Sequence, residues 1–316
     1  MTPATPAIKT VTLTKAFNGT TAVNGLSLDV APGELFGLVG SDGAGKTTTM
    51  RMLTAIMDPS AGDAWVLGRH TVREAEAIKE EIGYMSQRFG LYPDLTVLEN
   101  INFYADIYRV PGRERAATIE RLLCFSNLTP FTRRLAGNLS GGMKQKLGLA
   151  CALVHTPRVL FLDEPTNGVD PVSRRDFWRI LYLLLRQGVT IFVTTAYLDE
   201  ADRCHRVGLI HQGKLLACDT PRNLRRLTEE TIIEVSSGDN RRCARLLREN
   251  IPGASVGLFG DRVHLVVDNQ TAGEERCAAV LAKEGIDLLG MRRIEPSLED
   301  VFVSVLGREA RREETR

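Results

Sequence analysis

The chain has 316 residues, enough for about two domains of ordinary size. Its 43% hydrophobic and 25% charged residues are typical of a globular protein with a buried core. The 40 basic residues nearly balance the 39 acidic ones, which argues against a nucleic-acid partner. The cysteines and histidines lack metal-ligand spacing, so no zinc site is expected. No segment approaches the about 20 apolar residues of a membrane span, and no signal peptide is recognised, so a cytoplasmic location is expected.

Residues 1–228 predict an α/β domain of buried strands and helices. Apolar or β-branched segments bounded by turn signals, such as Asn18-Gly19, predict strands over 11–13, 26–30, 35–39, 159–162 and 190–194. Helical patterns predict helices over 46–56, 97–108, 113–125 and, with Ser140 as the N-cap, 140–155. Helical patterns dominate between about residues 88 and 138, which we interpret as a helical insertion within the α/β domain.

Residues 229–307 predict a second, smaller domain. Its expected elements, in chain order, are a strand over 232–235, a helix over 241–250, a hairpin of 255–259 with 263–267, a helix over 274–284 and a strand over 288–294. The order β-α-β-β-α-β is typical of a ferredoxin-like α+β module. The charged tail, residues 308–316, is expected to be disordered.

One loop has the G-x-x-x-x-G-K-[ST] pattern that binds nucleotide phosphates. It consists of Gly40, Ser41, Asp42, Gly43, Ala44, Gly45, Lys46 and Thr47, and we assign the following Thr48 to the same ATP-binding loop. Its glycines let successive backbone N–H groups turn inward around a phosphate, in front of a helix N-terminus. Lys46 is expected to reach the β- and γ-phosphates, and the Thr47 hydroxyl to bind Mg²⁺. ATP and Mg²⁺ are therefore the expected ligands.

An apolar strand that ends in two acids supplies the complementary chemistry. The segment 159–162 is followed by Asp163 and Glu164, about a hundred residues after the phosphate-binding loop. A carboxylate at the end of such a strand can reach the Mg²⁺ shell, which assigns Asp163 to the metal. Glu164, next along, is expected to act as the general base that polarises the attacking water.

A second helix N-terminus has the composition of an anion site. Ser140, Gly141 and Gly142 begin a predicted helix, where backbone N–H groups and the helix dipole attract a phosphate. One chain does not need two such helix ends for one nucleotide. Two chains do, if each offers this helix to the γ-phosphate held by the phosphate-binding loop of the other. Residues 140–142 are therefore expected to bind ATP in trans.

Together these motifs resemble the ATP-binding cassette (ABC) family over residues 8–227. The resemblance implies a P-loop fold with a mostly parallel core sheet, an antiparallel β subdomain and a helical insertion. It also implies that Phe17 stacks on adenine and that Gln87 contacts Mg²⁺ and the attacking water. The segment Asn167, Gly168, Val169 and Asp170 resembles the D-loop that crosses between the two subunits of the dimer.

Within the family, the segments 140–146 and 295–302 most resemble exporters of the drug- and antibiotic-efflux type. The first domain is particularly similar to the first cassette of bacterial exporters that carry two cassettes in one chain. The resemblance implies ABC-2-type transmembrane permease subunits as partners, a position at the inner face of the cell membrane, and an ATP-bound homodimer or a heterodimer with a second cassette. The cargo is not readable, because the family's substrate contacts lie in its membrane subunits.

The chain departs from the family at one position. The family usually has a histidine that contacts the γ-phosphate after the strand 190–194, and here Ala196 takes its place. Losing one such contact costs about 2–4 kcal/mol of transition-state stabilisation, or about 10²–10³ in rate. Related drug-efflux cassettes also lack this histidine. With Lys46 and Glu164 intact, we expect weak to moderate hydrolysis.

Two alternative functions follow from the same residues. The first is a regulatory cassette that hydrolyses ATP weakly and pairs with a competent one, which Ala196 favours and Glu164 opposes. The second is an ABC ATPase without a transport role, acting in DNA repair or translation. The neutral net charge, the single cassette and the lack of coiled-coil or zinc insertions argue against the second.

Overall fold

The computed structural model of the chain describes residues 5–87, 90–227, 231–251, 254–267, 270–302 and 304–306. The chain divides into two compact units, Met1–Thr220 and Pro221–Arg316, each of which is described by itself. The boundary predicted after residue 228 and the tail 308–316 lie outside the described residues, so both stay predictions. The described helices include none that is both long enough and apolar enough to cross a membrane.

A six-stranded sheet forms the core of the first unit. Its strands lie in the order β10-β9-β3-β8-β7-β6, and every neighbouring pair is parallel except β10 with β9. Their bounds are β3 (Leu35–Val39), β6 (Ile82–Met85), β7 (Val159–Asp163), β8 (Thr190–Thr195), β9 (Arg206–His211) and β10 (Lys214–Asp219). All residues of β3, β7 and β8 are buried, as expected for apolar parallel strands covered on both faces. The predicted parallel core is confirmed.

An antiparallel sheet packs beside this core. Its strands lie in the order β2-β1-β4-β5, with bounds β1 (Ile8–Phe17), β2 (Thr20–Val30), β4 (Ala61–Val66) and β5 (Arg69–His70). Asn18 and Gly19 connect β1 to β2, and both have positive φ, as two-residue hairpin turns require. Apolar side chains of both sheets and of α1 (Lys46–Leu53) form one core, so α1 lies between the sheets. The antiparallel subdomain is therefore also confirmed.

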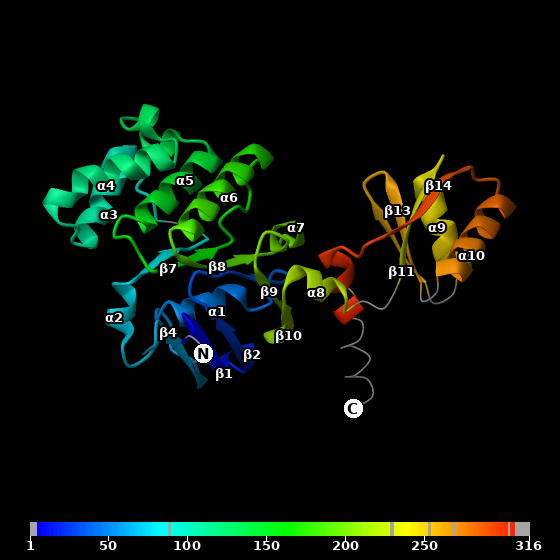
Figure 1. Cartoon of the computed structure of the whole chain (residues 1–316), viewed down its shortest axis with the longest axis horizontal. Helices are drawn as coiled ribbons and strands as arrows, with labels where there is room; N and C mark the ends of the chain where they lie inside the picture. Colours follow the sequence, from blue (N-terminus) through cyan, green and yellow to red (C-terminus); the bar gives the residue numbers. More distant parts are fainter. Residues whose placement is uncertain are drawn as a thin grey trace. The chain divides into compact units, whose positions relative to one another are not determined.

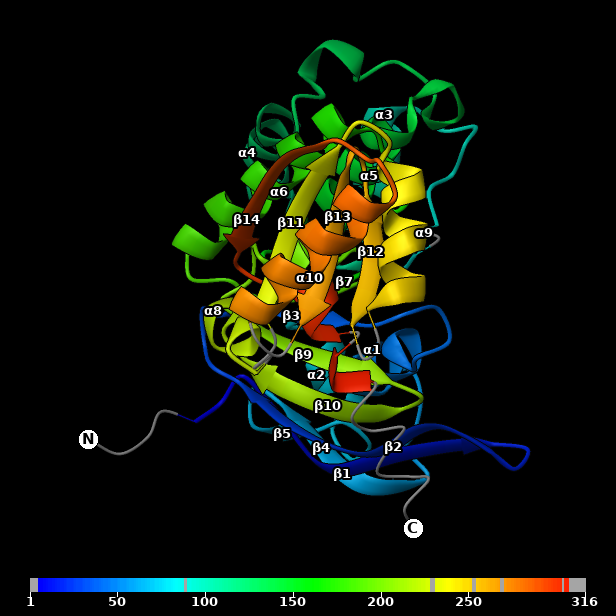
Figure 2. The same cartoon turned by 90° about the vertical axis from the view of Figure 1, so that its right-hand side faces the viewer.

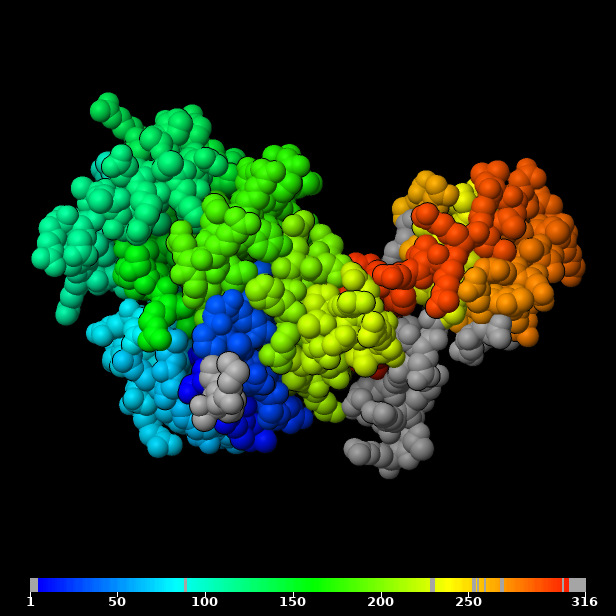
Figure 3. Space-filling view, in the orientation of Figure 1, coloured from blue at the N-terminus to red at the C-terminus, as the bar shows by residue number. Residues whose placement is uncertain are grey.

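Helices cover the other face of the core sheet. They are α3 (Val97–Ile107), α4 (Gly112–Phe125), α5 (Gly141–Ala152) and α6 (Pro171–Arg186), and Figure 1 shows them on the side opposite α1. Short helices α2 (Ala75–Lys79) and α7 (Leu198–Ala201) and the 3-10 turns Thr129–Phe131 and Ala136–Asn138 complete the unit. Helices α3 and α4 form an outer lobe of the unit (Figure 3). The helix predicted over 46–56 ends earlier, at Leu53, and that over 140–155 ends at Ala152.

The second unit has the predicted β-α-β-β-α-β order. After α8 (Pro221–Arg225) it contains β11 (Thr231–Ser237), α9 (Asn240–Asn250), β12 (Ser255–Phe259), β13 (Arg262–Val267), α10 (Gln270–Lys283) and β14 (Leu288–Ile294). Its strands are antiparallel in the order β12-β13-β11-β14, the arrangement of a ferredoxin-like sheet. Both helices contribute to one apolar core with β11 and β13, and Figure 2 shows them beside the sheet. The predicted α+β module is confirmed.

Candidate functional site

The candidate site lies at the carboxyl edge of the core sheet. Strand register sets this position, because Val39 pairs with Thr195 and Asp163 pairs with Thr194. The segments that follow β3, β7 and β8 therefore leave the sheet at the same edge. This edge is where open α/β sheets bind their ligands.

The phosphate-binding loop connects β3 to α1 as predicted. Gly43 and Gly45 have φ of 76° and 103°, a region that side chains rarely adopt. A Cβ on Gly40 would lie 2.2 Å from the Ile210 carbonyl oxygen, and one on Gly45 would lie 2.4 Å from that of Ala22. The loop is thus held against neighbouring backbone, which explains why these positions need glycine. Its backbone N–H groups precede the N-terminus of α1, the geometry that suits an anion.

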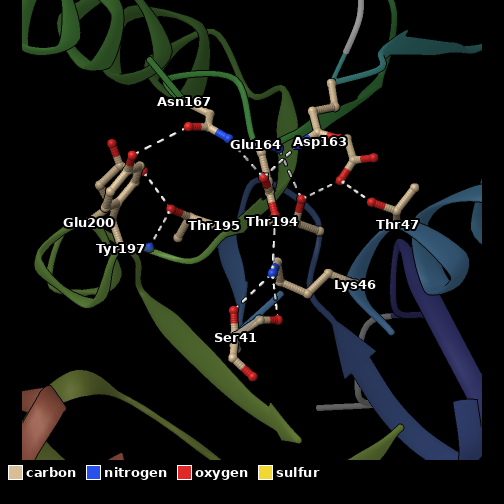
Figure 4. Close-up of polar contacts among 12 residues, drawn as sticks. Ser41, Lys46, Thr47, Asp163, Glu164, Asn167, Thr194, Thr195, Tyr197 and Glu200 are labelled. Atoms are coloured by element: carbon tan, nitrogen blue, oxygen red, sulfur yellow. Dashed lines mark hydrogen bonds and ion pairs between the residues drawn. The ribbon is translucent and has the colours of Figure 1, made fainter. Parts of the chain in front are cut away.

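Lys46 is buried at the centre of this loop, with only 4% of its surface exposed. Its Nζ donates to the carbonyl oxygens of Gly40, at 2.8 Å, and Ser41, at 3.0 Å (Figure 4). It also lies 3.0 Å from Oε1 of Glu164. A buried ammonium paired with a buried carboxylate is strongly coupled to it, because little water screens the pair.

Asp163 and Thr47 meet beside this ion pair. Oδ1 of Asp163 accepts hydrogen bonds from the hydroxyls of Thr194, at 2.6 Å, and Thr47, at 3.2 Å. Its other oxygen, Oδ2, is buried and has no hydrogen-bond partner among the described residues. Burial raises the pKa of the Asp163 carboxyl, and the hydrogen bonds from Thr194 and Thr47 oppose the rise. A buried carboxylate oxygen without a donor, next to a hydroxyl, fits a hard divalent cation such as Mg²⁺.

Glu164 is held by three side chains. Its Oε1 contacts Lys46, while its Oε2 accepts hydrogen bonds from Nε2 of Gln87, at 2.9 Å, and Nδ2 of Asn167, at 3.3 Å. Its φ of 47° lies in the left-handed region, which costs about 1–3 kcal/mol for a residue other than glycine. Its N–H donates to the Thr194 carbonyl oxygen at 3.1 Å. The predicted residues Lys46, Gln87 and Glu164 are therefore together in one cluster.

Phe17 and the Ser-Gly-Gly helix end lie outside this cluster. Phe17 ends β1, is 43% exposed, and has the Lys15 ammonium 5.3 Å from its ring centroid. An exposed aromatic face of this kind is available for stacking. No hydrogen bond or ion pair of the described chain joins residues 140–142 to the phosphate-binding loop.

The helix end itself is built as predicted. Ser140 is the N-cap of α5, and its Oγ accepts from the N–H of Met143 at 3.3 Å. Ser140 and Gly141 are exposed, whereas Gly142 is buried and a Cβ there would lie 2.4 Å from Cβ of Ser173. Close packing against α6 explains the second glycine, and the exposed first two residues leave the N-terminus open to a ligand.

The predicted D-loop residues 167–170 connect the end of β7 to α6. Asp170 is the N-cap of α6 and accepts from the N–H groups of Val172, at 3.1 Å, and Ser173, at 2.9 Å. The bond from Ser173 holds the pKa of the Asp170 carboxyl below its ordinary value. Gly168 has a φ of 70°, which makes the turn before the helix, and Val169 follows it.

Ala196 lies directly after β8, beside a cavity of about 220 Å³. The cavity is lined by Asp42, Glu164, Thr166, Asn167, Thr195, Ala196 and Tyr197. Asp42 and Thr195 therefore lie on the same cavity as the predicted base. The methyl group of Ala196 offers this cavity no hydrogen-bond donor.

Two residues of the site were missed by sequence reasoning. Thr194 donates to Asp163 and fixes its orientation, and Glu200 is buried, with 1% of its surface exposed. Glu200 accepts hydrogen bonds from four side chains, namely Thr166, Arg174, Trp178 and Thr195. The two threonines that end a buried strand were a signal for such roles, since a hydroxyl there must find a partner. Glu200 lies in a charged segment that resembles an exposed surface, so nothing in the sequence predicted that its carboxylate is buried.

Comparisons with known proteins agree with this geometry. The sequence model of the family described as ABC transporter matches residues 23–167. The probable multidrug ABC transporter ATP-binding protein YbhF of Escherichia coli K12 is 42% identical over 290 residues, which cover 90% of this chain and 49% of that protein. The Nod factor export ATP-binding protein I of Burkholderia thailandensis is 38% identical over 300 residues, which cover 93% of this chain and 95% of that protein. The bacitracin transport ATP-binding protein BcrA of Bacillus licheniformis is 32% identical over 302 residues, which cover 95% of this chain and 97% of that protein.

Solved structures agree as well. The ATP-binding subunit of an ABC transporter superimposes with a TM-score of 0.64 at 26% identity, covering 70% of this chain and 92% of the other. The dimeric structure of MJ0796, a bacterial ABC transporter cassette, superimposes with a TM-score of 0.62 at 26% identity, covering 67% of this chain and 98% of the other. The chain belongs to the family of ABC transporter ATP-binding proteins. It spans about half the length of the YbhF proteins that it matches.

Proposed function

We propose that this chain binds and hydrolyses ATP and thereby drives an ABC-type exporter. The observation that carries the proposal is the buried cluster at the sheet edge, in which Lys46, Glu164 and Asp163 lie beside an anion-binding loop. An ammonium, a base and a cation-binding carboxylate are the groups that phosphoryl transfer to water needs. The family membership of the chain supports the same activity.

Each residue of the cluster has one task in this proposal. Lys46 exchanges its contact with Glu164 for the β- and γ-phosphates, and the loop 40–48 binds the phosphates through backbone N–H groups. Glu164, released from Lys46, accepts a proton from the attacking water. Thr47, Asp163 and Gln87 would hold Mg²⁺, which when bound neutralises charge on the phosphate oxygens. The unpartnered Oδ2 of Asp163 supports that assignment.

A second cassette completes the site in this proposal. Residues 140–142 of one chain would bind the γ-phosphate held by the other, and the D-loop, residues 167–170, would cross between the chains. Ser140 and Gly141 are exposed, and among the described residues no hydrogen bond or ion pair joins them to the phosphate-binding loop, which supports a role in trans. The dimeric MJ0796 cassette is a structural precedent for such pairing. Hydrolysis would remove the shared phosphate and let the pair separate, which turns chemistry into motion.

Membrane permease subunits of the ABC-2 type are the proposed partners, at the inner face of the cell membrane. The names of three relatives refer to multidrug transport, Nod factor export and bacitracin transport, which supports export as the direction. The chain itself would contribute the motor, because it carries the buried cluster proposed to hydrolyse ATP. The pair would be a homodimer or would include a second, different cassette.

One alternative has an observation of its own. Because Ala196 offers no donor to the cavity beside Glu164, the chain could act as the weaker, regulatory cassette of a heterodimer. The ATPase rate of the isolated chain distinguishes the two functions. A motor cassette hydrolyses ATP without help, while a regulatory one binds ATP and needs a competent partner.

The test of the proposal is the substitution Glu164→Gln. It keeps the size of the side chain and removes the base, so we expect hydrolysis to fall by about 10²–10⁴ while ATP remains bound. Glu114→Gln is the matched control, because Glu114 is an exposed residue of α4 whose ion pair with Arg113 lies on the surface. Retained hydrolysis in Glu164→Gln, or equal losses in both variants, would contradict the proposed mechanism.

A further inference from the structure

A continuous hydrogen-bond chain joins Tyr197 to Glu164. The Tyr197 hydroxyl donates to Oδ1 of Asn167 at 3.3 Å, and Nδ2 of Asn167 donates to Oε2 of Glu164 at 3.3 Å (Figure 4). The carboxylate only accepts, so the amide nitrogen must face it, which leaves the amide oxygen for the phenol. The chemistry of the three groups thus fixes one direction of hydrogen bonding, from Tyr197 through Asn167 to Glu164.

The Tyr197 ring is itself held by a partly buried charge. The guanidinium of Arg174 lies 4.6 Å from the ring centroid, a cation–π contact. Glu200 fixes that guanidinium, accepting from its Nε at 3.1 Å and its Nη2 at 2.8 Å. Thr195 donates to Glu200 at 2.8 Å and accepts from the Tyr197 N–H at 3.0 Å. Ring and backbone of Tyr197 are therefore anchored to the same buried carboxylate.

The two carboxylate oxygens of Glu164 have different partners. Oε1 pairs with Lys46, whereas Oε2 accepts from the amides of Gln87 and Asn167. When the phosphates draw Lys46 away, Oε1 becomes free to accept a proton from water. Oε2 keeps its two amide donors, which hold the carboxylate in place. Asn167 therefore acts on the oxygen that does not take the proton, as a positioning group should.

We propose that Tyr197 is a positioning residue for Glu164 and acts through Asn167. In this chain Ala196 cannot help to order the cavity that it shares with Glu164, Asn167 and Tyr197. The next residue along, Tyr197, supplies the donor from the same segment. This inference rests on the proposed function, because it assumes that Glu164 is the base.

The test uses Tyr197→Phe, Asn167→Ala and the double variant in single-turnover ATP hydrolysis. Tyr197→Phe keeps the ring on Arg174 and removes only the hydroxyl, so we expect the maximal rate to fall about three- to ten-fold. The ATP concentration for half-maximal rate should change less than two-fold, because no phosphate contact is lost. The double variant should be no slower than Asn167→Ala alone, since Tyr197 acts through Asn167.

Tyr182→Phe is the matched control. Tyr182 lies on α6, as Arg174 does, and its hydroxyl donates to the Arg203 carbonyl oxygen at 3.4 Å. A full rate in Tyr197→Phe, additive losses in the double variant, or an equal loss in Tyr182→Phe would each overturn the inference. Glu164→Gln, measured in the same assay, distinguishes a failure of the proposed function from a failure of this inference. If it hydrolyses ATP normally, the proposed function fails together with this inference. If it is inactive and Tyr197→Phe is not slowed, only the inference fails.

Discussion

The two halves of the candidate site are built in opposite ways. Around Lys46, Asp163 and Glu164 the charges are buried, and their partners come from segments far apart in the sequence. Around Ser140 and Gly141 the groups are exposed, and the hydrogen bonds stay within one helix turn. The first half depends on the whole fold, whereas the second is a local helix end whose N–H groups face outward.

This difference shows which binding partners each half of the site lacks within one chain. The buried half already holds the proposed base Glu164 in contact with the Lys46 ammonium and beside the Asp163 carboxylate, so in this proposal it lacks only nucleotide and metal. The exposed half has donors and no ligand within its own chain. We therefore propose that a second cassette unites them, and the predictions below change residues in and around the two halves.

Adding a hydrogen-bond donor at Ala196, an exposed residue on the cavity beside Glu164, should have the largest effect. Ala196→His places an imidazole in the cavity of about 220 Å³ next to Glu164, where it can contact the γ-phosphate. We expect ATP turnover to rise at least ten-fold, toward the 10²–10³ that one charge-stabilising donor is worth. Steady-state phosphate release measures it. Ala196→Phe fills the same space without a donor and should give no gain. If the native chain already has unimpaired turnover, and Ala196→His does not alter it, the cost assigned to Ala196 is refuted.

Removing the exposed ring of Phe17 should have a smaller effect. If the ring stacks on adenine, Phe17→Ala should weaken ATP binding about ten- to hundred-fold, because stacking of a base on an aromatic side chain contributes about 1–3 kcal/mol. Phe17→Tyr keeps an aromatic face and should bind ATP as the native chain does. Equilibrium binding of a fluorescent ATP analogue measures both. Equal affinity in Phe17→Ala would remove Phe17 from the site.

The uncompensated charge of the buried half should be visible in stability. Burial raises the pKa of Asp163 in the folded state above its value in the unfolded chain. At a pH above the unfolded-state pKa, folding therefore disfavours the ionised carboxylate. The stability of the folded chain falls as the pH rises from the unfolded-state pKa through the folded-state pKa. Asp163→Asn removes this charge and keeps an acceptor for Thr47 and Thr194. Without Mg²⁺ and nucleotide at neutral pH, we expect the Tm to rise by about 2–4 °C, the shift for about 1 kcal/mol.

The matched control for this change is Asp176→Asn. Asp176 lies near the surface of α6 and pairs with Lys146 and Arg179 at 3.4 Å, so its removal should not raise the Tm. Calorimetry across neutral and acidic pH measures both variants, and the gain of Asp163→Asn should shrink as the pH falls. A lower Tm for Asp163→Asn would show that its carboxylate is stabilising without a metal.

Sequence patterns predicted the elements and the local motifs well. The loop 40–47, the N-cap Ser140 and the buried strands depend on residues close together in the chain, so their signals are local. The Lys46–Glu164 ion pair and four of the five hydrogen bonds that Glu200 accepts from side chains join segments far apart, which no local pattern encodes. Only the family resemblance assigned Gln87 to the site, as a contact of Mg²⁺ and the attacking water, and its hydrogen bond to Glu164 was not predicted. The end of α1 at Leu53 followed from the left-handed Ala55, which nothing in the sequence required.

The most direct test of the account mixes two inactive variants. Lys46→Ala disables the phosphate-binding loop, and Gly141→Glu puts a negative charge at the helix end. The nearest atom to a Cβ on Gly141 is the Gly168 carbonyl oxygen, 3.9 Å away, so the variant should fold. In a mixed dimer one site carries both changes and the other carries neither.

We therefore expect each variant alone to lack hydrolysis, and a one-to-one mixture to recover roughly a quarter of the native rate, since half of the randomly formed dimers have one intact site of two. Phosphate release from the mixture measures it. A mixture as inactive as its components, with native-like melting of both variants, would contradict the claim that two chains share each nucleotide.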